Sequence, residues 1–155
     1  MPERIDGGTV FAVIGGALLL VSLFLNWYVA PGVAPAPDVA VGNAWDVFES
    51  LDLILAAIAA GSIYLAYAQA TGGLASSRAW MLPLGIAGLA IVGSQILNPP
   101  PVVSPPVTAP GTVGPDPAIG AWLALAGSVG LFVGGVLSRA SVSFSVNFDS
   151  AEATR

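Results

Sequence analysis

The chain has 155 residues, of which 55% are hydrophobic and 8% are charged, with a mean hydropathy of +0.85. Soluble domains carry about 25% charged residues, so this chain has too few to cover a water-facing surface. Cysteine and histidine are absent and the formal net charge is −5. Their absence excludes disulfides, thiolate chemistry and imidazole-based catalysis. We therefore expect an integral membrane protein with no catalytic residues, no metal and no cofactor.

Four apolar segments match the length of about 20 residues that a helix needs to cross a bilayer core. They cover residues 8–28, 47–70, 80–98 and 118–137. The segments between them on the opposite side from the termini, 29–46 and 99–117, contain repeated prolines, which favour extended structure. The sequence thus predicts an all-α membrane protein in which residues 1–140 form a four-transmembrane-helix bundle. Acidic residues before the first segment replace the basic region of a cleaved signal peptide, so we expect a span there.

The arginines predict the orientation. Arg4, Arg78, Arg139 and Arg155 all fall on one side of the predicted bundle, and the two opposite loops contain no basic residue. Basic residues concentrate on the cytoplasmic side, so both termini are expected there, in a bacterial cytoplasmic (inner) membrane. The full net charge of −5 is expected on the outer side, carried by Asp38, Asp46, Glu49, Asp52 and Asp116.

Aromatic residues agree with this topology. Tryptophan and tyrosine favour the two membrane–water interfaces. The outer interface is predicted to hold Trp27, Tyr28, Trp45 and Trp122, and the inner interface Tyr64, Tyr67 and Trp80.

The first and third segments read as copies of each other. Residues 14–26 and 86–98 match at five of thirteen positions without a gap, ending in Ser22/Ser94 and Asn26/Asn98. A proline-containing loop follows each copy, and then an Ala-Trp pair, Ala44-Trp45 or Ala121-Trp122, opens the next span. Because both hairpins start on the same side, we expect a parallel duplication of a two-helix hairpin about an axis along the membrane normal.

The chain also resembles uncharacterised four-span membrane proteins common in actinobacteria. The resemblance covers most of the chain and is carried by residues 23–28 (LFLNWY), 51–57 (LDLILAA), 97–100 (LNPP) and 120–127 (GAWLALAG). The pattern often has proline where Asn26 stands. The resemblance implies the four-span topology and names no function.

Acidic residues at the start of the second span are the first candidate site. Asp46, Glu49 and Asp52 are spaced three apart, and a capping role is the simple interpretation for Asp46 and Glu49. Asp52 would lie deeper, where an ionisable group is unfavourable and faces the bundle or a water-filled cavity. The hypothesis is an outward-open polar pocket for a cation or proton, formed by Asp52, Glu49, Asn26, Gln95 and Asn98, with Ser94 at a similar depth. The alternative is hydrogen bonding that only joins helices.

Two further features concern assembly. Small residues on the fourth span, Gly120, Gly127, Gly130 and Gly134, permit close helix packing, either within the bundle or against another subunit. The tail, residues 141–155, begins with an alternating pattern that places Val142, Phe144, Val146 and Phe148 on one face. Period-two alternation is typical of a strand, which could add to a partner's sheet; an interfacial or unstructured tail is the alternative.

These observations favour a non-catalytic integral membrane subunit or scaffold that assembles with itself or a larger membrane-protein complex and contacts membrane lipids. The alternative is a small oligomeric channel or transporter subunit whose acidic outer side attracts cations. A membrane enzyme using only Asp46, Glu49 and Asp52 is a third class, which lacks an accompanying nucleophile. The absence of a basic patch argues against nucleic acid as a partner.

Overall fold

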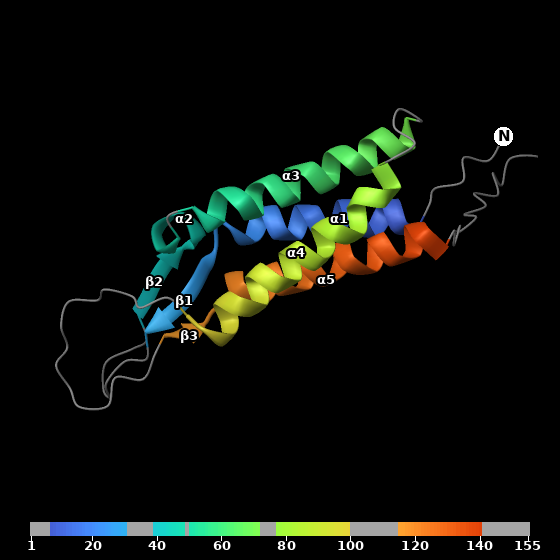
Figure 1. Ribbon diagram of the computed structural model, residues 1–155. Helices are drawn as coiled ribbons and strands as arrows, with labels where there is room; N and C mark the ends of the chain where they lie inside the picture. The colour runs from blue at the N-terminus through green and yellow to red at the C-terminus, as the bar shows by residue number, and fades with distance from the viewer. Residues whose placement is uncertain (1–6, 31–38, 49, 72–76, 100–114, 141–155) are drawn as a thin grey trace, which may run out of the picture.

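The long helices lie side by side in one bundle (Figure 1). The computed structural model describes residues 7–30, 39–48, 50–71, 77–99 and 115–140. The long helices are α1 (Gly7–Ser22), α3 (Leu51–Ala70), α4 (Ser77–Leu97) and α5 (Ile119–Ala140). Successive long helices run in opposite directions, so the start of α1 and the end of α5 lie at the same end. The predicted strand-like tail lies outside the described residues.

Three of these helices, α3, α4 and α5, are long and apolar enough to cross a membrane, while α1 is apolar but has only 16 residues. A helix rises 1.5 Å per residue, so α1 is about 24 Å long. The predicted first span, residues 8–28, extends past the end of this helix at Ser22. The chain leaves the helix after Ser22 and becomes a strand at Asn26.

Local hydrogen bonds explain where α1 ends. The N–H groups of residues 23–25 each donate to the carbonyl three residues earlier, which tightens the chain beyond an α-helical turn. The Trp27 indole Nε1 donates to Ser22 O at 2.8 Å, and Ala44 N donates to Leu23 O at 3.2 Å. Carbonyl groups at a helix end need such partners, above all in an apolar surrounding. The end of α1 is thus satisfied by protein groups.

A small antiparallel sheet occupies the end of the bundle opposite the start of α1 (Figure 1). Its strands β1 (Asn26–Ala30), β2 (Val39–Asn43) and β3 (Asp116–Pro117) are ordered β2-β1-β3. The sequence predicted loops at β2 and β3 and placed the first three residues of β1 in the first span, because the short strands carry no clear alternation.

An irregularity in this sheet determines which aromatic side chains are buried. Asn26 pairs with Asn43 and Tyr28 pairs with the next residue, Gly42, so Trp27 is an extra residue in β1. In a regular strand, neighbouring side chains point to opposite faces; a bulge changes the direction of a side chain. As a result, Trp27 and Tyr28 are both fully buried.

The second predicted span is interrupted near its start. A one-turn helix, α2 (Ala44–Val47), ends at Phe48, whose backbone is extended, and α3 starts only at Leu51. The Phe48 ring packs edge-on against Trp27, with the ring centres 5.0 Å apart. Burial of Phe48 against the aromatic residues of β1 gives a physical reason for the interruption, because this contact places the phenylalanine where a continuous helix would not.

Candidate functional site

The structure places the residues of the predicted polar pocket on separate elements. Asn26 is exposed on β1, Gln95 is half-buried near the end of α4, and Asn98 is exposed just beyond it. Within the described part of the chain, no hydrogen bond or ion pair joins Asp52 to any of these three residues. Glu49 lies outside the described residues. The pocket stays a prediction, without a contact between its members to support it.

Asp52 lies in the first turn of α3 and is 5% exposed. Its Oδ1 accepts a hydrogen bond from the N–H of Leu53 at 2.7 Å. The expectation that Asp46 and Asp52 share one continuous helix was wrong, because the chain is extended at Phe48 between them. A carboxylate is favourable in a first turn because of the unpaired N–H groups and the helix dipole. The position of Asp52 therefore has a structural explanation.

Asp46 takes part in capping, in a role different from the predicted one. Asn43 is the N-cap of α2, and its side chain accepts a hydrogen bond from Asp46 N. The Asp46 carboxylate in turn accepts from Asn43 N, and both distances are 3.2 Å. This reciprocal pair is a capping box, with Asp46 in its third helical position. Asparagine was missed as the cap because the predicted helix began later.

Tyr28 connects β1 to α4. Its hydroxyl donates to the backbone oxygen of Gln95 at 2.8 Å. In a continuing helix, that carbonyl would accept from the N–H of residue 99, but residue 99 is proline and has none. The tyrosine hydroxyl therefore supplies the missing donor. Burial raises the pKa of Tyr28 to about 12, so the hydroxyl keeps its proton at any physiological pH.

The four predicted packing glycines all face other parts of the same chain. A Cβ added at Gly127 would come within 2.7 Å of Gly15 O and Leu19 N on α1, and one added at Gly15 would meet Gly127 O at 2.7 Å. A Cβ added at Gly130 would lie 3.2 Å from Gly15 Cα. The backbones of α1 and α5 are thus in direct contact, as small residues permit in membrane helices.

The two outer members of the stripe extend this contact. A Cβ at Gly134 would meet Gly8 O at 2.8 Å, and one at Gly120 would meet Asn26 O at 2.7 Å. We call the contact between α1 and α5 at Gly8, Gly15, Gly127, Gly130 and Gly134 the glycine seam. Of the two predicted roles for these glycines, packing within the bundle and packing against another subunit, the glycine seam favours the first.

Polar side chains link all four long helices at the end where the chain starts. Thr9 on α1 donates to Gln69 Oε1 on α3 at 3.3 Å, and Gln69 Nε2 donates to Met81 Sδ on α4 at 3.3 Å. Ser138 on α5 contacts the same sulfur, at 3.8 Å from its Oγ. Sequence reasoning missed this group. Gln69 gave the available signal, because an amide inside an apolar span usually has a partner.

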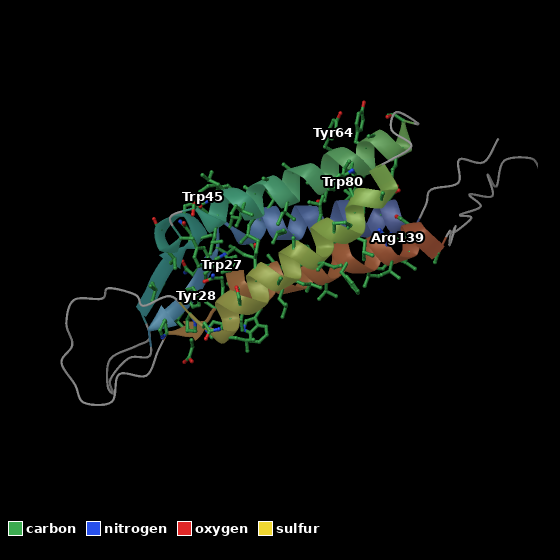
Figure 2. All side chains as sticks on the ribbon, viewed as in Figure 1. Trp27, Tyr28, Trp45, Tyr64, Trp80 and Arg139 are labelled. Carbon is green, nitrogen blue, oxygen red and sulfur yellow. The ribbon has the colours of Figure 1, made fainter. Side chains whose placement is uncertain are left out.

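The exposed aromatic residues fall into two groups along the bundle. Figure 2 shows Tyr64 and Trp80 toward the end with Arg139, and Trp45 toward the sheet. Trp45, Trp122, Tyr64, Tyr67 and Trp80 are all exposed, as expected for interfacial residues. Trp27 and Tyr28 are not exposed with them, because the bulge in β1 turns both side chains into the protein core.

The described residues contain no group of three or more acidic, histidine or cysteine side chains that could hold a metal ion. Comparisons with protein-family models, curated proteins and solved structures found no match.

Proposed function

We propose that this protein is a non-catalytic integral membrane subunit, with four spans and both ends in the cytoplasm, that assembles with itself or with a larger membrane complex. One observation carries the proposal. In the described part of the bundle, most polar side chains form hydrogen bonds within the chain. Large apolar side chains such as Ile14, Leu53 and Ile86, each more than half exposed, cover its outside. Such a surface fits lipid and other membrane helices.

The contact between α1 and α5 favours an assembly role over conduction by one chain. At the glycine seam the two helices touch through their backbones, which leaves no space for a conduit between them. An ion path between α1 and α5 is therefore excluded. The resemblance to four-span actinobacterial proteins is consistent with the proposed topology and with a bacterial cytoplasmic membrane.

Contacts in the structure also support the proposed duplication. They align the second and fourth spans differently from the alignment that was based on the two Ala-Trp pairs. Ala44-Trp45 lies in α2 whereas Ala121-Trp122 lies in α5, so the two pairs are not equivalent. A better match joins residues 60–65 (AGSIYL) on α3 and 126–131 (AGSVGL) on α5. In this register Ser62 corresponds to Ser128.

Contacts within each hairpin agree with that register. A Cβ added at Gly16 would meet Ser62 Oγ at 2.5 Å, and one added at Gly88 would meet Ser128 Oγ at 3.1 Å. Gly16 and Gly88 are equivalent in the alignment of the first and third spans. One alignment makes the two glycines equivalent, and the other makes the two serines equivalent. In each hairpin the glycine contacts the serine, as a parallel duplication requires.

A mass measurement tests the assembly role. The chain would be extracted from its own membrane in a native nanodisc and its mass determined. We expect a particle containing several copies of the 15.5 kDa chain or one defined partner in fixed ratio. A single chain bound only to lipid would contradict the proposal. Cation flux through vesicles containing the same particle would instead favour the channel.

A further inference from the structure

The two hairpins meet along three separate contact regions. The first is the glycine seam between α1 of the first hairpin and α5 of the second, where Gly15 and Gly127 approach reciprocally. These contacts are between main chains, so they do not depend on how a flexible side chain is arranged. They form an interface of the kind that holds separate membrane helices together.

The second region lies at the sheet. Strand β1 belongs to the first hairpin and pairs with β3 of the second, so that Val29 faces Asp116. Ala118 N donates to Trp27 O at 2.7 Å, and the Tyr28 hydroxyl reaches Gln95 O. Backbone hydrogen bonds therefore join the two hairpins at the sheet end of the bundle. The covalent connection between α3 and α4 lies at the other end.

The third region lies at the opposite end, where Gln69 of α3 donates to Met81 of α4. Each end and the middle of the bundle thus has its own contact between hairpins. Residues 72–76, which join α3 to α4, are the covalent connection at this end.

We infer that the two hairpins, residues 1–71 and 77–155, are separable modules, each of which binds the other through the glycine seam and the shared sheet and does not need the covalent connection. The inference rests on the proposed duplication and is independent of the assembly role. An ancestral pair of identical hairpins would have needed such an interface before the copies were fused, and closed two-fold pairs are the commonest assemblies of identical chains.

Cleavage of the full chain tests the inference. A protease recognition sequence is inserted between residues 72 and 76, an affinity tag is placed at the N-terminus, and the folded protein is cleaved in nanodiscs and moved to mild detergent. We expect the tag to recover at least nine-tenths of the C-terminal fragment. Recovery of little or none, from a protein that is folded before cleavage, would overturn the inference.

Two glycine variants test which surface holds the modules. In the cleaved protein, Gly127→Ala should lower recovery of the C-terminal fragment several-fold, because the added methyl separates α1 from α5. The matched control is Gly93→Ala on α4, where an added Cβ meets nothing within 4 Å, and recovery should stay unchanged. Equal recovery from both variants would contradict the seam as the interface. The nanodisc mass of the uncleaved chain reports on the assembly role separately.

Discussion

Single glycines differ in what they contribute, and the contrast between Gly127 and Gly93 is a direct test. Gly127→Ala introduces a methyl against the backbone of α1, and overpacking of this kind destabilises by about 1–3 kcal/mol. Gly93→Ala fills open space and removes a flexible residue from a helix, which is neutral or stabilising by up to about 1 kcal/mol.

Reversible unfolding in mixed micelles, with increasing sodium dodecyl sulfate, measures both changes. The two variants should move the midpoint in opposite directions, or Gly93→Ala should leave it unchanged. If Gly127→Ala were as stable as the parent chain, the close approach of α1 and α5 would be wrong.

Tyr28 also gives a pH dependence. In the unfolded chain its pKa is near 10.0, whereas in the folded protein burial raises it to about 12. Between these values the unfolded state binds fewer protons than the folded state, so its contribution to stability falls as pH rises from about 10 to 12. Below pH 10 this contribution is fully present.

The stability of the parent chain and of Tyr28→Phe would be compared at pH 8 and pH 11. The parent should lose more of its unfolding free energy over this interval than the variant. Equal losses would show that the Tyr28 hydroxyl titrates alike in both states.

At the scale of elements, the end of α4 shows how one strand replaces a helical hydrogen bond. Tyr28→Phe removes the donor to the partly buried Gln95 O, and loss of such a hydrogen bond lowers stability by about 0.5–1.5 kcal/mol. Pro99→Ala restores an N–H at the position where the helix would supply it.

We therefore expect Tyr28→Phe to lower stability and Pro99→Ala to recover part of that loss in the double variant. In the parent background, where Tyr28 already occupies the carbonyl, Pro99→Ala should have a smaller effect. Unfolding of the four proteins forms a double-mutant cycle. If the effects of the two changes were simply additive, the Tyr28 hydroxyl would not be replacing the missing N–H of residue 99.

The helices were the most predictable elements, because long apolar runs dominate the sequence from Leu51 onward. Their exact limits were less predictable. The end of α1 depends on Trp27 and Ala44, and the interruption at Phe48 depends on the packing of its ring against Trp27. Such contacts join residues from different elements, and apolar composition contains no information about them.

The candidate site was predictable in part. Spacing alone identified the glycines, because small residues four apart form one face of a helix. It placed Asp46 and Asp52 on one helix and grouped Asn26 with Asn98, since it assumed unbroken helices. The sheet changes the surroundings of both Asn26 and Asp46. The Tyr28 contact with Gln95 spans 67 residues and had no local signal.

At the scale of the whole molecule, the natural absence of cysteine permits a direct test of topology. Single cysteines replacing Ser50, Asp116, Thr71 or Ala140 would be exposed. With both termini inside, an impermeant maleimide added to intact cells should label positions 50 and 116. Positions 71 and 140 should react only after permeabilisation. The reverse pattern would invert the proposed orientation, and labelling of all four from outside would contradict the spans.

The hydrogen bond from Ala44 to Leu23 has a consequence for biogenesis. The Leu23 carbonyl, just beyond α1, finds this partner 21 residues later in the chain, after β2. In the proposed four-span topology, α1 therefore enters the membrane, while the chain leaves the ribosome, before its end is complete. Its release into lipid is favoured only once the following segment has arrived, so the first hairpin should leave the insertion machinery as a pair of helices.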